Sequence, residues 1–70
     1  MPYIRCISKK ELALLYFPHS SPDTARRRLM RWIRKCQPLV EALRREHYDS
    51  HSHMFTKRQV QIIIYYLDEP

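Results

Sequence analysis

The chain has 70 residues, a mass of 8.6 kDa and a formal net charge of +6 at pH 7, so we expect a single small domain over residues 1–70. It contains no glycine, which excludes the phosphate-binding loops of P-loop and dinucleotide-binding proteins and the nucleophile elbow of serine hydrolases, because those turns need a residue without a Cβ. The longest apolar run, over residues 12–17, is far shorter than the roughly 20 residues of a membrane span, so we expect no membrane segment.

The first predicted elements are a short strand over residues 3–7, which is rich in β-forming residues, and a helix over residues 9–16. Ser8 followed three residues later by Glu11 is the pattern of a capping box, in which each side chain accepts a hydrogen bond from the other residue's amide. The apolar residues that share one face of this helix are Leu12, Leu15 and Tyr16. The helix is expected to end before Pro18, because the residue that precedes a proline disfavours the α region.

A second helix is predicted over residues 22–36, because Ser21 can cap it and Pro22 suits its first position. Its apolar face at helical spacing consists of Ala25, Leu29, Trp32, Ile33 and Cys36. Trp32 is expected to anchor the core between the first two helices. The other side of the helix carries Arg27, Arg28, Arg31, Arg34 and Lys35. One helix is thus expected to present an apolar face and an arginine-rich face.

A third helix is predicted from Pro38 to about Glu46, since a proline can open a helix that it could not continue. Its apolar positions are Leu39, Ala42 and Leu43. Residues 48–55 are the least regular part of the chain and indicate a loop or the tip of a β-hairpin. Part of residues 50–55 is expected to pair with residues 3–7 as a small wing.

The C-terminal segment, residues 60–67, is strand-like by propensity but keeps helical spacing. Thr56 and Gln59 form a second capping-box pattern, which favours a helix. The predicted fold is therefore mainly α, with about four helices and a short β-hairpin or wing. A single small core leaves three apolar residues of the last helix unused, namely Ile62, Tyr65 and Tyr66. These predict a contact with a partner chain or with a second copy in a homodimer.

Positive charge is concentrated in the first half of the sequence. Residues 5–35 contain nine Lys and Arg against two acidic residues, a net charge of +7, whereas residues 36–70 contain four against five, a net charge of −1. Such asymmetry indicates a polyanionic partner for the first half, although a solvated basic face that only keeps the protein soluble would look the same.

A short capped helix, a brief turn and a longer helix with outward arginines follow in the order of a helix-turn-helix, whose second helix enters the major groove of duplex DNA. In that interpretation Ser20, Ser21 and Thr24 lie near a phosphate or a base edge. The basic residues expected to contact DNA are Arg27, Arg28, Arg31, Arg34 and Lys35. We therefore expect a non-enzymatic DNA-binding protein, a regulator of transcription or of a mobile element. The alternatives are a protein-interaction module that uses the last helix, and an RNA-binding accessory protein.

No catalytic, metal or cofactor site is expected. His47, His51 and His53 lie close together in the sequence, but neither Cys6 nor Cys36 accompanies them at the spacing of a zinc site. No nucleophile has a base beside it, and no small-molecule substrate is indicated. Residues 1–5 lack the apolar core of a signal peptide, so we expect a cytoplasmic location and reduced cysteines.

The sequence resembles a family of short uncharacterised bacterial proteins, a domain of unknown function known mainly from Bacteroides-type gut bacteria. The resemblance spans almost the whole chain and rests on Glu11-Leu12-Ala13, Leu15-Tyr16-Phe17-Pro18, Ala25, Arg28-Leu29, Arg31-Trp32-Ile33, Phe55-Thr56, Gln59-Val60, and the ending from Tyr66-Leu67 to Glu69-Pro70. It implies an independent small domain with a helix-turn-helix-like front half, and no activity or site residue. The chain departs from the family pattern at His47 and Asp68, where glycine is expected after a helix.

Overall fold

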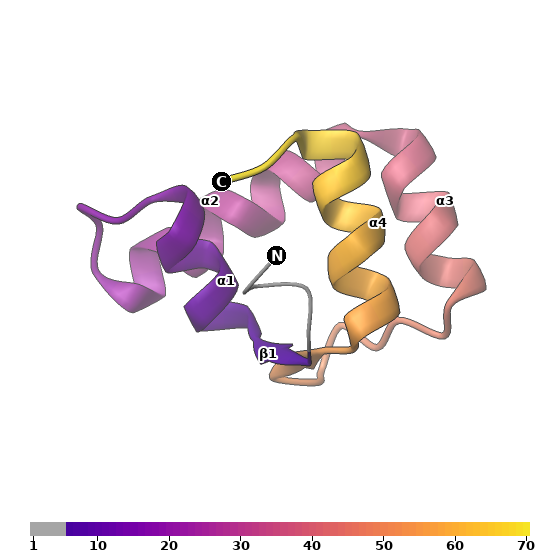
Figure 1. Cartoon of the computed structure of the whole chain (residues 1–70), viewed down its shortest axis with the longest axis horizontal. Coiled ribbons are helices and arrows are strands. Elements are labelled where there is room, and N and C mark those ends of the chain that lie inside the picture. The colour runs from indigo at the N-terminus through magenta and orange to yellow at the C-terminus, as the bar shows by residue number, and fades with distance from the viewer. Residues whose placement is uncertain (1–5) are drawn as a thin grey trace.

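Caps and prolines divide the chain into short elements, which the computed structural model describes for residues 6–70. In chain order they are β1 (Ile7–Ser8), α1 (Lys9–Tyr16), α2 (Pro22–Lys35), α3 (Gln37–Arg45), β2 (Met54–Phe55) and α4 (Lys57–Leu67). The predicted mainly α fold is confirmed, and the first three helices begin and end within one residue of the predicted bounds. Figure 1 shows α1 at one end of the molecule, α3 and α4 at the other, and α2 running behind them.

The helices enclose one core. α2 packs against both α1 and α3, and α4 packs against α3. The buried apolar side chains come from every element: Ile7, Leu12, Ala13, Ala25, Leu29, Ile33, Leu39, Leu43, Phe55, Val60 and Ile63. Because α2 lies between α1 and α3, its remaining circumference faces solvent, and this exposed part carries the basic residues.

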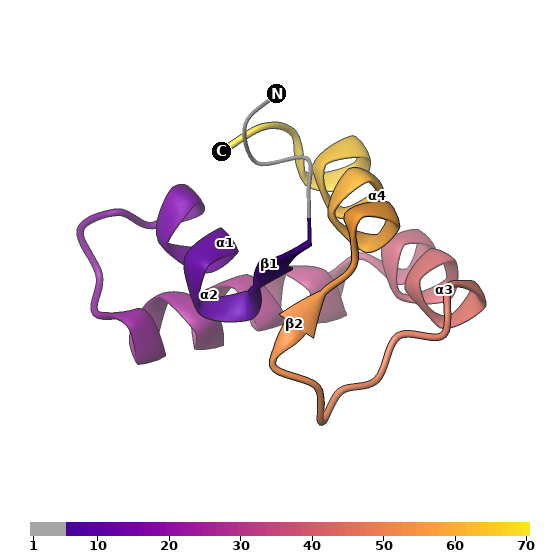
Figure 2. The same cartoon turned by 60° about the horizontal axis from the view of Figure 1, so that its bottom comes forward.

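The two strands join the start of α1 to the segment before α4. They pair antiparallel, with Ile7 opposite Phe55 and Ser8 opposite Met54. The pairing continues one residue further, because the Lys9 amide donates to the His53 carbonyl at 2.9 Å. The predicted pairing with part of residues 50–55 is thus confirmed for residue 7, whereas the predicted strand residues 3–5 lie outside the described chain. Figure 2 brings this small sheet to the front.

The C-terminal segment is a helix, as its cap predicts. The Gln59 amide donates to Thr56 Oγ1 at 3.1 Å, and the Thr56 amide donates to Gln59 Oε1 at 3.0 Å, so both bonds of the capping box are formed. Gln59 is itself buried, and its Nε2 donates to the Glu46 carbonyl at 3.3 Å. The same side chain therefore caps α4 and holds it to the end of α3.

Leu15 is not part of the core, contrary to the prediction from periodicity. The buried residues of α1 are Lys9, Leu12 and Ala13, and Leu15 is 42% exposed. Lys9 and Ala13 stand four residues apart on the face that α1 turns inward, which moves Leu15 to the outer side of the helix. The half of the capping box in which Ser8 Oγ accepts from the Glu11 amide, at 3.0 Å, is confirmed.

Trp32 is likewise not a buried anchor, since it is 45% exposed. Its ring packs edge-on against Phe17 and Tyr16, with centroid distances of 4.7 and 6.4 Å. These two aromatic residues lie at the end of α1, so the three rings close the rim between α1 and α2 instead of filling the interior. Cys36, also expected on the core face, is half-buried because α2 has already ended and Cys36 joins it to α3.

Two residues without the freedom of glycine adopt positive φ angles. His47, after α3, has φ 59°, and Asp68, after α4, has φ 69° and ψ 173°. These are the two positions at which the family resemblance leads us to expect glycine. The Asp68 conformation falls in a region that is almost restricted to glycine, because a Cβ crowds the backbone there. The Asp68 carbonyl also accepts a hydrogen bond from Tyr16 Oη at 2.6 Å, which joins the end of α4 to α1.

Replacing Asp68 by glycine should relieve this crowding and keep the carbonyl that Tyr16 contacts. We expect Asp68→Gly to raise the free energy of unfolding by about 1 kcal/mol in chemical denaturation. Asp68→Ala removes the same charge but keeps a Cβ, so it should bring no such gain. An equal gain in both variants would show that the charge, and not the backbone, is unfavourable at this position.

Candidate nucleic-acid interface

The N-terminus of α2 is organised by its own hydroxyl groups. Ser21 Oγ accepts from the Thr24 amide at 3.3 Å and donates to Thr24 Oγ1 at 2.9 Å. The Ser20 amide donates to the Phe17 carbonyl at 3.2 Å and so closes the turn after α1. The three residues predicted to meet a phosphate or a base edge are therefore adjacent, with the Ser21 hydroxyl engaged in the cap.

An acidic residue stands in the first turn of α2 and is paired. Lys10 Nζ lies 3.1 Å from Asp23 Oδ1. This hydrogen bond and the charge of Lys10 hold the pKa of Asp23 below its ordinary value, with a smaller contribution from Arg26 and Arg27. Asp23 is therefore ionised at neutral pH, where its negative charge is favourable beside the positive end of the helix.

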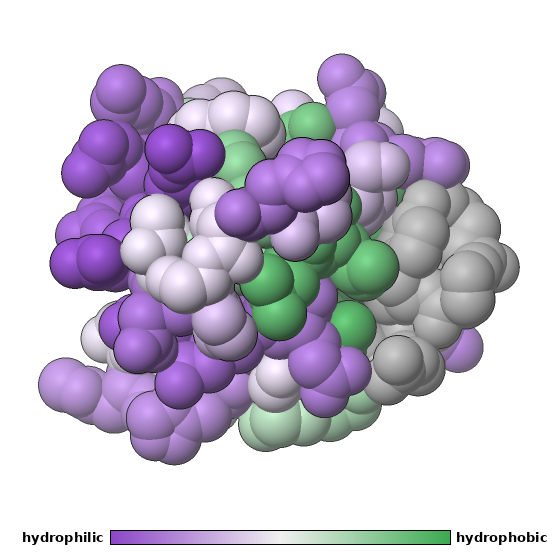
Figure 3. Space-filling view, turned by 90° about the vertical axis from the view of Figure 1, so that its left-hand side faces the viewer, coloured by the Kyte–Doolittle hydropathy of each residue, from purple (hydrophilic) through white to green (hydrophobic). Residues whose placement is uncertain are grey.

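The exposed surface of α2 is strongly basic. Its exposed cationic residues are Arg27, Arg28, Arg31, Arg34 and Lys35. Within residues 6–70, none of these five forms an ion pair with a carboxylate. Figure 3 views the end of the molecule that carries the turn between α1 and α2, and it shows hydrophilic side chains gathered along one side with a smaller apolar area beside them.

Within residues 6–70, the side-chain hydrogen bonds of these arginines stay within α2. Arg27 donates to Thr24 Oγ1 at 3.4 Å, and Arg34 Nε donates to the Met30 carbonyl at 3.2 Å. Arg28 instead lies over the Phe17 ring, with its guanidinium carbon 5.7 Å from the centroid. A guanidinium has five N–H donors, and each of these contacts uses few of them. The contacts therefore orient the arginines and leave N–H donors that can bind an anionic partner.

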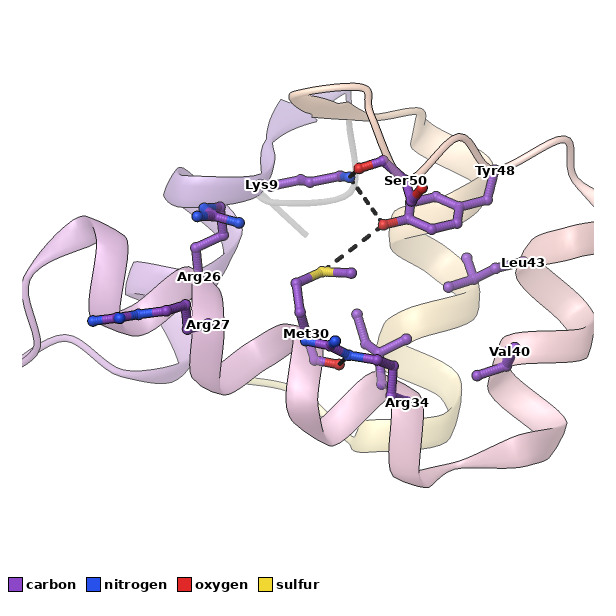
Figure 4. A pocket seen from close by; sticks show the side chains of 10 residues that line it. Lys9, Arg26, Arg27, Met30, Arg34, Val40, Leu43, Tyr48 and Ser50 are labelled. Atoms are coloured by element: carbon purple, nitrogen blue, oxygen red, sulfur yellow. Dashed lines mark hydrogen bonds between the residues drawn. The ribbon is translucent and has the colours of Figure 1, made fainter.

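A cavity of about 300 Å³ opens beside the basic surface, between α2, α3 and residues 48–50. Its lining is Lys9, Arg26, Arg27, Met30, Ile33, Arg34, Val40, Leu43, Tyr48 and Ser50. Figure 4 shows Val40 and Leu43 pointing from α3 toward α2, with Tyr48 and Lys9 at one end of the hollow. Arg27 and Arg34 thus border the cavity, whereas Arg28, Arg31 and Lys35 do not line it.

Lys9 is the principal residue of this region that the sequence analysis missed. It is only 4% exposed, and its Nζ donates to Tyr48 Oη at 2.9 Å and to the Ser50 carbonyl at 3.2 Å. The same ammonium lies 4.7 Å from the centroid of the Tyr48 ring and 5.6 Å from that of Phe55. One signal was available, because Lys9 stands three and four residues before the buried Leu12 and Ala13 and so shares their face.

A second surface lies on α4, where apolar residues were predicted to be left over. Tyr65 is 78% and Tyr66 40% exposed, and Ile62 is half-buried. The two tyrosine rings meet edge to face at 5.0 Å. Together with residues of α3 they line a groove of about 470 Å³, which also contains Arg45 and the pair of Arg58 with Glu46 at 3.9 Å.

The remaining candidate side chains do not gather. His47, His51 and His53 are all exposed, and within residues 6–70 no three His, Cys, Asp or Glu side chains are placed to hold a metal ion. Cys6 is exposed, Cys36 is half-buried, and both are free thiols. The segment before β2 nevertheless adjoins the basic helix, because residues 50–53 and residues Lys10, Asp23 and Arg26 line one hollow of about 240 Å³.

A family model described as a domain of unknown function (DUF4248) matches residues 3–70. Neither the curated proteins nor the solved structures show a significant match to this sequence. Among the helices of the described chain, none is sufficiently long and apolar to cross a bilayer.

Removal of the buried ammonium should cost far more than removal of its exposed neighbour. We expect Lys9→Ala to lower the free energy of unfolding by about 2–4 kcal/mol, because the stem leaves a hole and the Tyr48 hydroxyl loses its donor. Lys10→Ala breaks only the solvent-exposed pair with Asp23 and should leave the free energy of unfolding almost unchanged. Denaturant titrations of the two variants measure both values, and equal effects would contradict a structural role for Lys9.

Proposed function

The chain belongs to the DUF4248 family, and we propose that it binds double-stranded DNA without catalysing a reaction, as a small regulator of transcription or of a mobile element. The observation that carries the proposal is the exposed basic surface of α2, which has five cationic side chains and no ion pair with a carboxylate within residues 6–70. A protein does not need so many positive charges on one helix to be soluble. The phosphates of a nucleic acid provide a row of negative charges that such a surface would bind.

The dimensions of α2 suit the major groove of B-DNA. A helix of 14 residues is roughly 21 Å long, and the groove, about 12 Å wide, accepts a helix with its side chains. Packing against α1 and α3 covers the apolar side of α2, so its basic side can approach DNA without exposing the core. The order of a short helix, a turn and a longer basic helix is also that of a helix-turn-helix.

Arginine is the residue best suited to both tasks at such an interface. Its planar donors can bind guanine O6 and N7 in the groove, or two phosphate oxygens beside it. Arg27, Arg31 and Arg34 recur at spacings of four and three residues, so they form one row along α2. We assign base and phosphate contacts to this row, and backbone contacts to Arg28 and Lys35.

The position of the residues before β2 is consistent with a complex in which α2 lies in the major groove. Residues 50–53 share a hollow with Asp23 and Arg26 of α2, so this loop lies beside the N-terminal half of the basic helix. In a complex with α2 in the major groove, the loop would meet the adjacent DNA backbone as a wing does. Ser20 and Thr24, at the start of α2, would lie near the same phosphates.

Binding to labelled duplex pools at several salt concentrations tests the proposal. We expect affinity to persist near 150 mM salt, and the triple variant Arg27→Gln, Arg31→Gln and Arg34→Gln to make the log–log salt slope shallower by about 2–3 and weaken binding about tenfold or more. The matched control, Arg44→Gln, Arg45→Gln and Lys57→Gln, removes the same charge from α3 and α4 and should change affinity far less.

Three outcomes would reject this interface. Equal weakening in the two triple variants would mean that only net charge matters. Loss of binding by 150 mM salt would mean that α2 carries a solvated face. A tRNA competitor that displaces the duplex efficiently would favour RNA, whose deep and narrow major groove does not admit a helix.

A protein-interaction function is the second candidate, favoured by the exposure of Tyr65 and Tyr66 beside the half-buried Ile62. Exposed tyrosines next to a groove are typical of protein interfaces. If α4 forms a homodimer, sedimentation at high micromolar concentration should detect the dimer, and Tyr65→Glu should dissociate it without altering the circular dichroism spectrum. If the parent protein is strictly monomeric at those concentrations, the homodimer proposal is wrong.

A further inference from the structure

The hydroxyl group of Tyr48 has a poor hydrogen-bond acceptor. Lys9 Nζ donates to Tyr48 Oη at 2.9 Å, so the phenolic hydrogen must be directed elsewhere. It is directed to the Met30 sulfur, 3.9 Å away, and a thioether is a weak acceptor. Both contacts are drawn in Figure 4, where the Tyr48 hydroxyl and the Met30 sulfur meet at one end of the cavity between α2 and α3. An anionic oxygen placed there would be a much better acceptor than sulfur.

The charge around the same cavity is of one sign. Its lining includes Lys9, Arg26, Arg27 and Arg34, and no acidic residue of the described chain lines it. The contacts of the buried Lys9 ammonium are equally neutral, since Nζ donates to the Tyr48 hydroxyl and to the carbonyls of Asp49 and Ser50, the former at 3.5 Å. The hydrogen-bond partners of this ammonium are neutral groups, so its positive charge favours an anion placed beside Tyr48.

The rest of the lining is apolar. Met30 and Ile33 come from α2, Val40 and Leu43 from α3, and in Figure 4 the α3 side chains point across the cavity toward α2. A bare inorganic anion would leave these side chains in contact with water, whereas a ligand with an apolar body would cover them. The volume of about 300 Å³ is at the lower end of the range that holds small ligands.

We propose that the cavity between α2, α3 and residues 48–50 binds a small amphipathic organic anion. Its carboxylate or phosphate head accepts a hydrogen bond from Tyr48 Oη and lies in the field of Lys9, with Arg26 and Arg34 at the rim. Its apolar body covers Met30, Val40 and Leu43. The site shares Arg34 with the proposed DNA interface, whereas Tyr48 and the apolar residues between the two helices belong to the cavity alone.

An NMR titration of the intact chain with simple probes tests the site. Octanoate supplies a carboxylate head and phenyl phosphate a phosphate head, each on an apolar body. The neutral 1-octanol and phenol lack the head, and acetate and inorganic phosphate lack the body. We expect saturable amide shifts at Met30, Val40, Leu43 and Tyr48 with at least one of the two amphiphiles, and about tenfold weaker binding of its neutral and headless counterparts.

Matched variants separate this cavity from general charge on α2. Arg26→Gln with Arg34→Gln removes two rim charges and should weaken the bound amphiphile about tenfold, whereas Arg28→Gln with Arg31→Gln removes two charges that do not line the cavity and should leave affinity within about twofold. Tyr48→Phe should also weaken binding about tenfold. Tyr48→Phe also loses the hydrogen bond from Lys9, and the variant could unfold for that reason. In that case the two double arginine variants still show whether the ligand binds in the cavity.

The proposal is overturned by any of three results. Binding of acetate or inorganic phosphate as tightly as the amphiphile would show attraction by charge alone. Binding of the neutral alcohols with equal affinity would show that the anion has no role. Equal loss of affinity in the two arginine pairs would place the ligand elsewhere on α2.

Discussion

The buried ammonium of Lys9 is the interaction on which the arrangement of this molecule depends. It stands at the first position of α1, and its hydrogen bonds reach Tyr48 and Ser50, some forty residues further along the chain. The Lys9 amide adds a bond to His53, and two residue pairs of β1 and β2 lie directly beside it. A sheet of two strands with two residues each is too short to be stable alone, so the lysine supplies much of the link between α1 and the segment that precedes α4.

The link explains how a chain without glycine or a disulfide in its described part orders an irregular segment. Residues 46–53 contain no helix or strand, yet the rings of Tyr48 and Phe55 stack at 5.9 Å beneath the Lys9 ammonium. This segment closes one side of the core, and it also forms one end of the cavity that the arginines of α2 border. Structural order and the shape of the candidate ligand site therefore depend on the same few contacts.

Local chemistry made much of the fold predictable. Ser8, Ser21 and Thr56 cap the three helices to which they were assigned, and the Thr56 cap decided correctly between helix and strand for residues 60–67. The exposed basic residues of α2 also lie where helical spacing puts them.

The predictions that failed concern contacts between segments that are distant in the sequence. A lysine is ordinarily expected to face solvent, so the burial of Lys9 could not be predicted without knowing that it contacts Tyr48. The burial of Lys9 also sets which face of α1 points inward, and this rotation leaves Leu15 exposed. The position of Trp32 was predicted wrongly because a helical wheel does not distinguish the rim of an interface from its centre. The cavity beside Arg34 was not predicted because one of its walls is α3, whose position relative to α2 is a tertiary contact.

The irregular wall of the cavity has a dynamic consequence. Of the residues that line it, those outside the helices are Tyr48 and Ser50. Detaching their segment separates one stacked aromatic pair and breaks the three hydrogen bonds of Lys9 Nζ, but few backbone hydrogen bonds. Separating α2 from α3 exposes the main core, which is a larger loss of apolar contact. The first event costs less free energy and is therefore more frequent than global unfolding. The interior between α2 and α3 can thus exchange its contents with solvent through local opening of residues 48–50, while the four helices remain packed.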